Sequence, residues 1–261
     1  MTTPASSPAS PPTSPRTSSL GAPVSRTIVR LGVRSVFGRR RGILLFVLPF
    51  VLIGLAVLVR VLVGEDADAA QDTLYGLGLA VIVPLVALIG TTGVLAPEID
   101  DGSISYLLAK PISRHTIVAS KLVVALTCVL VFAAAPMLVA GLILLAEEPQ
   151  LAVGFALGSL VGGAAYSAVF ALMSVMTRHA VVVGLIYLLI WEGLLGGLLD
   201  GVRWLSITRW AGAITEQVAD GFGISEDLGL GYAVTATVVV IVLGTWLTGR
   251  RLRAFNLTGD E

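Results

Sequence analysis

Six long apolar runs constrain the fold of this chain more than any other feature. Each run approaches or exceeds the ~20 residues that a helix needs to cross the hydrocarbon core of a bilayer. A single span can satisfy its backbone hydrogen bonds in lipid only as an α-helix. The sequence therefore predicts an all-α integral membrane protein with six transmembrane helices, at about residues 42–63, 74–96, 116–146, 151–176, 180–199 and 228–248.

The composition supports the membrane class. Hydrophobic residues make up 56% of the chain, charged residues only 13%, and the mean hydropathy is +0.92. Soluble domains carry about 25% charged residues. The single cysteine, Cys128, excludes an intramolecular disulfide, and one cysteine with two histidines makes a structural zinc site a poor prediction. We expect no metal site and no nucleic-acid partner.

The distribution of Lys and Arg predicts the orientation. With the amino terminus inside, fourteen of these residues fall on the cytosolic side and three fall outside, namely Arg60, Arg203 and Arg209. Positive residues accumulate in cytosolic loops, so both termini are predicted to be cytosolic in a multi-pass protein of the cell (plasma) membrane. The outer loops are acidic. The longest, residues 200–227, contains Trp204, Trp210 and Phe222, and is expected to form one or two short helices or an extended loop.

The two ends of the chain lie outside the six-span domain, residues 42–253. Residues 1–23 hold six of the twelve prolines and predict a disordered cytoplasmic tail. Residues 24–41 repeat arginine every fourth residue among apolar ones, which predicts an interfacial elbow helix in the headgroup plane. A plain basic flank that only sets orientation is the alternative. Residues 254–261 form a short cytoplasmic tail.

The segment between the second and third predicted spans predicts a short cytosolic helix at about residues 102–110. Pro97 is expected to end the second span. Asp100 and Asp101 suit the first turn of the next helix, where acids oppose the helix dipole. The residues that share its apolar face by i, i+3, i+4 spacing are Ile104, Leu107 and Leu108.

Lys110 and Pro111 mark the end of this short helix, and Ser113 is placed to cap the third span. The apolar face has two candidate destinations. It can rest on lipid or neighbouring spans, or it can fill a groove in a cytosolic partner. The pattern of the helix alone does not separate these two alternatives.

This segment resembles the signature of the ABC-2 family, the type-2 permeases of ABC exporters. The matching positions are Glu98, Gly102, Ser103, Leu107, Leu108, Pro111, Ile112, Ser113, Arg114 and Lys121. Ser103 stands where the family usually has threonine. The elbow helix, the six spans and the long outer segment before the last span also match, over about residues 24–253.

The resemblance implies a permease subunit of an ABC exporter rather than an enzyme. Two permeases, identical or related, would pair and dock two cytosolic ATPases. ATP and Mg²⁺ would be bound by those partners, because this chain has no Gly-x-x-x-x-Gly-Lys-Ser/Thr loop. The implied docking region around the coupling helix comprises Glu98, Asp101, Gly102, Ile104, Leu107, Leu108, Pro111, Ser113, Arg114 and Lys121.

Glu192 is the only acid within a predicted span. A charged carboxylate in the membrane costs about 2.5–3.5 kcal/mol even on insertion scales, so it should face the bundle. Two interpretations remain open: Glu192 lines a transport path, or it pairs with Arg60, which lies at a similar depth near the outer end of the first span.

Two glycine series repeat at every fourth residue, a spacing that permits close helix packing. They are Gly154, Gly158 and Gly162 in the fourth span, and Gly193, Gly197 and Gly201 at the end of the fifth. The contact can lie within one protomer or between two permeases. Pro49, Pro84 and Pro136 lie inside spans and are expected to bend them.

Other classes fit less well. Neither a Gly-x-Ser-Gly nucleophile nor a His-Glu-x-x-His zinc motif occurs, which disfavours intramembrane proteases. Ion-coupled transporters usually place several acids or histidines at mid-membrane, whereas Glu192 stands nearly alone. The alternative that remains is a non-transporting scaffold, or a subunit that docks another cytosolic partner through residues 98–121.

Overall fold

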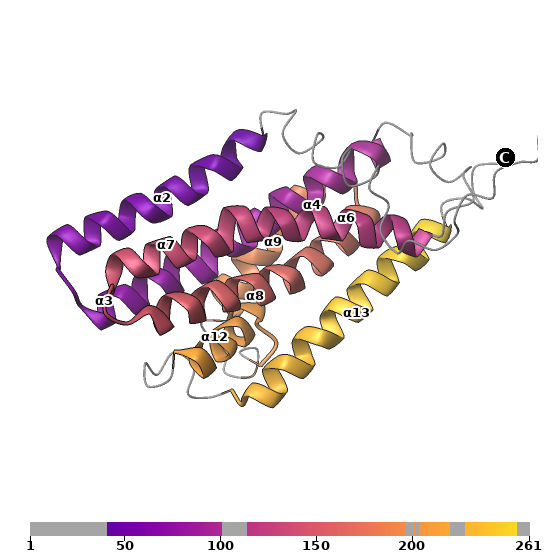
Figure 1. The fold of residues 1–261 in the computed structure, drawn as a ribbon. Helices are drawn as coiled ribbons and strands as arrows, with labels where there is room; N and C mark the ends of the chain where they lie inside the picture. Colours follow the sequence, from indigo (N-terminus) through magenta and orange to yellow (C-terminus); the bar gives the residue numbers. More distant parts are fainter. Residues whose placement is uncertain (1–40, 101–113, 197–200, 202–203, 220–227, 255–261) are drawn as a thin grey trace, which may run out of the picture.

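The computed structural model describes residues 41–100, 114–196, 201, 204–219 and 228–254, and these contain helices and no strand. The predicted amino-terminal tail, residues 1–23, and the predicted coupling helix at 102–110 lie outside the described residues. So do the predicted elbow helix at 24–41, except Arg41, and the predicted tail at 254–261, except Ala254. The described helices form one bundle, with most of the long helices roughly parallel or antiparallel (Figure 1).

The chain runs through the bundle as a series of long helical rods. The first is α2 (Arg41–Leu62). The second joins α3 (Ala67–Asp72), the π-helical segment η1 (Thr73–Ile82) and α4 (Val83–Asp100). The third joins α6 (Arg114–Val129), η2 (Leu130–Ala134) and α7 (Ala135–Leu144). The remaining helices are α8 (Pro149–Met176), α9 (Ala180–Tyr187) with η3 (Leu188–Leu195), α12 (Ile207–Val218) and α13 (Leu230–Ala254).

Five of the described helices are long and apolar enough to cross a membrane. The predicted span at 180–199 corresponds to a shorter apolar helix, Ala180–Leu195, beyond which residues 197–200 lie outside the described part. At 1.5 Å per residue, this helix is about 24 Å long, slightly less than the ~30 Å hydrocarbon core. The five spanning helices and the apolar exterior make the chain a multi-pass membrane protein.

Helix α8 lies at the centre of the bundle and packs against α4, α6, α7, α9, α12 and α13 (Figure 1). Its sequence is rich in glycine, alanine and serine, whose small side chains allow close approach of neighbouring helices. Phe155, Tyr166 and Phe170 fill the larger spaces and are almost fully buried. By contrast, most residues of α2 and α13 are partly or fully exposed. These two helices therefore present apolar side chains to lipid or to another chain.

Two of the three described π-helical segments end just before a proline. Val83 donates its N–H to Gly78, five residues back, ahead of Pro84. Ala135 donates to Leu130 in the same way, ahead of Pro136. A proline in a helix lacks an N–H and clashes with the carbonyl four residues earlier. The local widening of the helix accommodates this clash, so the rod continues through the proline.

Two predicted helix limits are corrected. Pro97 does not end the second rod, because α4 continues to Asp100; a proline removes one donor but still permits a helix when its neighbours compensate. At the other end, the rod begins at Ala67, inside the predicted loop 64–72. Asp66 caps this start, since its carboxylate accepts from Ala69 N at 2.7 Å.

The connections define two ends of the bundle. At the Glu192 end lie the turns 63–66 and 145–148 and the helix α12. At the Lys121 end lie the start of α2, the helices flanking residues 101–113, the turn 177–179 and the end of α13. The two candidate sites lie at these opposite ends.

Candidate functional site

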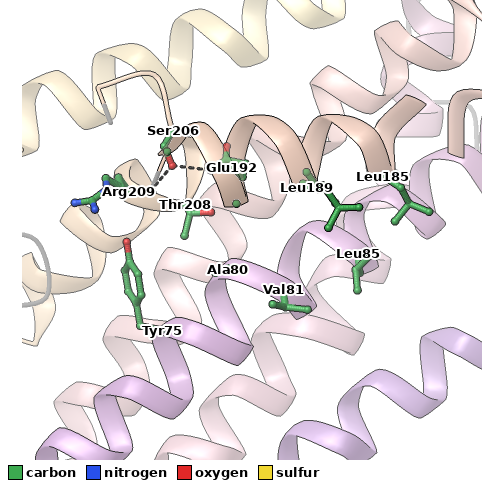
Figure 2. Close-up of a pocket in the computed structure, with 13 residues that line it drawn as sticks. Tyr75, Ala80, Val81, Leu85, Leu185, Leu189, Glu192, Ser206, Thr208 and Arg209 are labelled. Atoms are coloured by element: carbon green, nitrogen blue, oxygen red, sulfur yellow. Dashed lines mark hydrogen bonds between the residues drawn. The ribbon is translucent and has the colours of Figure 1, made fainter. Parts of the chain in front are cut away.

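A cavity of about 460 Å³ opens at the Glu192 end, between the second rod, η3 and the start of α12 (Figure 2). Its volume falls within the ~300–1,000 Å³ typical of small-molecule sites. Both η1 and η3 contribute to its wall, and π-helical turns occur frequently at functional sites. The lining residues are Tyr75, Ala80, Val81, Leu85, Leu185, Leu188, Leu189, Glu192, Gly193, Gly196, Ser206, Thr208 and Arg209.

Glu192 binds the amino terminus of α12. Its Oε2 accepts from Ser206 Oγ at 2.6 Å, and its Oε1 accepts from Ile207 N at 3.0 Å. Tyr187 Oη makes a longer contact of 3.5 Å with Oε1. A carboxylate that receives backbone and hydroxyl donors at a helix start is favoured by hydrogen bonding and by the helix dipole. The charge of Glu192 is thus stabilised within the protein.

Ser206 connects Glu192 to the helix it caps. As the N-cap of α12 it has extended φ and ψ of −84° and 123°, and its Oγ accepts from Arg209 N at 3.3 Å. The same hydroxyl donates to Glu192. One serine therefore accepts a hydrogen bond from a free N–H of the first helical turn and donates a hydrogen bond to the carboxylate.

Three further aromatic residues hold this helix start. Tyr166 of α8, fully buried, shares a hydrogen bond of 2.8 Å with Thr208 Oγ1. The carbonyl of Trp204 accepts from Trp210 Nε1 at 2.8 Å and from Tyr232 Oη at 2.9 Å. Contacts from α8, η3 and α13 therefore converge on the same turn, so α12 is fixed to the bundle.

The first glycine series packs against α12 within one protomer. A β-carbon on Gly154 would lie 2.8 Å from the Thr215 carbonyl oxygen, and one on Gly162 would lie 2.8 Å from Ala211 Cβ. At Gly158, an added β-carbon would overlap Thr215 Oγ1 and lie 2.7 Å from the Ala211 carbonyl. The missing side chains let α12 lie directly on the backbone of α8.

The second glycine series behaves differently. Gly193 lines the cavity, and an added β-carbon there would approach only its own segment, at 3.5 Å from the Leu188 carbonyl. At Gly201 no atom lies within 4 Å of such a carbon. Gly197 is outside the described residues. Among the described residues, no tight packing accounts for Gly193 or Gly201.

The predicted pair between Glu192 and Arg60 does not form. Arg60 Nη2 instead binds Glu65 Oε1 at 2.5 Å, with both side chains about one-third exposed. Gly64 adopts a positive φ of 89° and turns the chain, which brings Glu65 back toward the end of α2. Glu65, the acid nearest to Arg60 in the sequence, therefore forms the ion pair. The start of α12 provides the hydrogen-bond donors to Glu192.

Lys121 defines the second candidate site, at the opposite end. Its side chain is only 3% exposed, and Nζ donates to the main-chain oxygen of Val94 at 3.1 Å. The bond joins α6 to the last turns of α4. Lys121 thus ties together the two helices that flank residues 101–113.

The other predicted docking residues are described only in part. Glu98 belongs to α4 and Arg114 is the first residue of α6, but the positions of their side chains are outside the described set. The remaining residues, Asp101, Gly102, Ile104, Leu107, Leu108, Pro111 and Ser113, lie outside the described residues. Lys121 is the only member of the predicted set with a described side-chain contact.

Sequence reasoning missed the partners of both charged residues. Ser206 carries a recognisable signal, a serine directly before an amphipathic helix, and its pairing with Glu192 then needs only proximity in the fold. No sequence signal identifies Val94, since the acceptor is its backbone oxygen. Tyr166 and Thr208 also meet through tertiary packing alone.

Comparison with known proteins gives the family. The family model described as ABC-2 family transporter protein matches residues 27–251, which is most of the chain. No match was found among curated proteins. The membrane-length helices agree with a transmembrane subunit. This multi-pass membrane protein belongs to the ABC-2 family and is a non-catalytic permease subunit of an ABC transporter.

Proposed function

We propose that this chain forms half of the membrane unit of an ABC exporter, in the plasma membrane, with six spans and both termini in the cytosol. A second permease, a copy or a relative, completes the unit, and two ATPases dock at the Lys121 end. Those ATPases bind ATP and Mg²⁺. The observation that carries the proposal is the buried bond from Lys121 to Val94, which joins the two helices on either side of the predicted coupling segment.

A rigid connection supports transmission of motion from that end to the cavity. The second rod runs without a break from Ala67 to Asp100, about 50 Å at 1.5 Å per residue. Its inner end precedes the coupling segment, and its η1 part lines the Glu192 cavity. When the ATPases close on ATP, they would displace the coupling segments, and α4 with α6 would tilt together because Lys121 binds them.

At the Glu192 end, the tilt would move the helices to which α12 is bound. Helix α12 borders the cavity through Ser206, Thr208 and Arg209, and Glu192 connects its start to η3. Relative movement of η1 and η3 would change the width of the cavity between them. In this proposal, cargo leaves the unit past the start of α12.

Copurification tests the docking part of the proposal. Leu107→Asp with Leu108→Asp should reduce recovery of the ATPase with the tagged chain by at least tenfold, because two carboxylates cannot enter an apolar groove without large desolvation. Membrane insertion should be unchanged. Val63→Asp, a carboxylate on an exposed residue at the opposite end, is the matched control and should leave recovery intact.

Undiminished recovery of the ATPase from the double variant would contradict docking at this segment. Recovery of a different cytosolic protein from native membranes, without any ATPase, would favour the scaffold alternative. Direction is tested separately: ATP added to inside-out vesicles should drive cargo into the lumen if the unit is an exporter.

A further inference from the structure

The Glu192 cavity changes in polarity from one end to the other. Leu85, Leu185 and Leu189 line the part of the cavity that lies away from α12, whereas Tyr75 and Arg209 lie at the opposite end, beside the start of α12 (Figure 2). Leu189 is 71% exposed at the surface of the isolated chain, so the apolar part is open toward the lipid side. A ligand that matches this cavity has an apolar chain and a polar head.

The charges of the cavity favour a negative head. Both carboxylate oxygens of Glu192 already accept hydrogen bonds, from Ser206 and from the backbone N–H of Ile207, which direct the carboxylate toward α12 while it keeps its negative charge. Arg209 is half-buried, and no ion pair to another described residue satisfies its guanidinium. It also lies in the first turn of α12, where the helix dipole disfavours a cation. An anion beside Arg209 would pair with the guanidinium and offset the unfavourable interaction with the helix dipole.

We propose that this cavity binds a single-chain amphiphile with an anionic head, which contacts Arg209 and Tyr75 while its alkyl chain lies along Val81, Leu85, Leu185 and Leu189. The cavity volume of about 460 Å³ accommodates one chain rather than a two-chain phospholipid with its headgroup. Binding of this kind does not require ATP or transport, so the inference stands or falls separately from the proposed export cycle.

The head, and not the chain, should set the selectivity. A chain that moves from bilayer to an apolar cavity exchanges one apolar environment for another and gains little, as in helix association within lipid. A charge-assisted hydrogen bond in a partly desolvated site instead changes affinity by about tenfold or more. Anionic and cationic amphiphiles with equal chains should therefore bind with clearly different affinities.

Photolabelling tests the site directly. The purified full-length chain, in phosphatidylcholine nanodiscs without nucleotide, is incubated with palmitate that carries a diazirine in mid-chain, and labelled residues are mapped by mass spectrometry. Labels should concentrate on residues 81–85 and 185–189. Unlabelled palmitate should compete, and hexadecyltrimethylammonium, with a chain of equal length and a cationic head, should compete at least tenfold less well.

Variants separate the head from the chain. Arg209→Gln should weaken palmitate competition about tenfold, and Arg209→Lys should retain most of it, because the cation remains. Arg60→Gln is the matched control, since Arg60 lies at the same end of the bundle but is paired with Glu65 outside the cavity. Leu189→Trp fills the open apolar part without disturbing α12 and should lower labelling of residues 81–85 severalfold.

Three outcomes would overturn the proposal. The first is labelling spread evenly over lipid-facing α2 and α13, the second is equal competition by the cationic amphiphile, and the third is unchanged competition by palmitate in a folded Arg209→Gln variant. Two further results, from Leu189→Trp and from crosslinking, would also reject it. If Arg209→Gln fails to fold, Leu189→Trp alone decides, because unchanged labelling there excludes the cavity. A Leu189→Cys variant that forms disulfide crosslinks between two permease chains, with no lipid adducts at residues 185–189, would assign this surface to a second copy and reject the amphiphile.

Discussion

Lys121 and Glu192 are opposite charges at opposite ends of the bundle, and each forms a hydrogen bond with the backbone of a neighbouring helix. Lys121 donates to a carbonyl near the carboxyl end of α4, and Glu192 accepts from the amino end of α12. They differ in access. Lys121 is 3% exposed, whereas Glu192 is partly exposed and lines an open cavity. The first charge is positioned to hold helices together, and the second can also respond to what enters the cavity.

The difference shows how an apolar bundle uses its few charges. A buried charge costs several kcal/mol unless hydrogen bonds and dipoles compensate it. Here Lys121 lies between the two helices that flank residues 101–113, and Glu192 lies at the start of α12. We infer that the Lys121 end behaves as one rigid body, while the Glu192 end holds a short helix by contacts that can be exchanged.

The largest expected effect tests whether α12 is held mainly by α8. Gly158→Ala places a methyl group against Thr215 and the Ala211 carbonyl, so α12 must move away. We expect a loss of about 1–3 kcal/mol in the free energy of unfolding, measured by SDS titration in mixed micelles, because overpacking forces backbone shifts. Gly54→Ala on α2, with no atom within 4 Å, is the control and should be neutral or slightly stabilising.

A tolerated Gly158→Ala would mean that α12 shifts on α8 at little cost. The whole of α12, and not only its contact with Glu192, would then be able to move relative to the rigid Lys121 end. Cysteine accessibility along residues 207–218 distinguishes a displaced helix from a locally adjusted one.

The second largest effect is expected when the bond between α6 and α4 is removed. Lys121→Met keeps the length and apolar stem of the side chain but loses the bond to the Val94 carbonyl. Hydrogen bonds to charged groups contribute about 1.5–3 kcal/mol, so a loss near 2 kcal/mol is expected in the same titration. Arg250→Met removes an exposed cation 4.5 Å from the Trp246 ring and should cost about 0.5–1 kcal/mol.

Lys121→Met should also lower cargo export per ATP hydrolysed, since α4 and α6 would no longer move together. If the free energy of unfolding and the export per ATP hydrolysed both match those of the parent chain, the Lys121 bond does not couple α4 to α6. In that case the desolvation free energy of the buried ammonium equals the stabilisation from its hydrogen bond, as is known for some buried charges.

The sequence predicts much of this fold because long apolar runs identify membrane helices. The long rods and the small-residue face of α8 follow from that signal. Limits near Asp66 and Pro97 were misjudged, because a local cap and a tolerated proline each extend a helix beyond its apolar run.

The candidate sites were less predictable, since charge partners depend on tertiary contacts. Glu192 is conspicuous in the sequence, but Arg60 was the wrong partner: Glu65, after the turn at Gly64, reaches Arg60 first. Lys121 was singled out only by family resemblance, and its acceptor is a main-chain atom that carries no residue signature. The cavity itself requires η1 and η3 to be placed side by side, which periodicity does not reveal.

The smallest expected effect separates the shape of the Glu192 contact from its charge. Glu192→Gln retains an oxygen for Ile207 N, and its amide can donate to Ser206 Oγ, so only the charge–dipole contribution of about 0.3–1 kcal/mol is lost. Glu192→Ala leaves the N–H of Ile207 unpaired and should cost about 1–3 kcal/mol. If the Gln variant loses as much as the Ala variant in the SDS titration, charge rather than hydrogen bonding holds α12. The two ends would then be held by the same electrostatic attraction, and access to the cavity would be their only remaining difference.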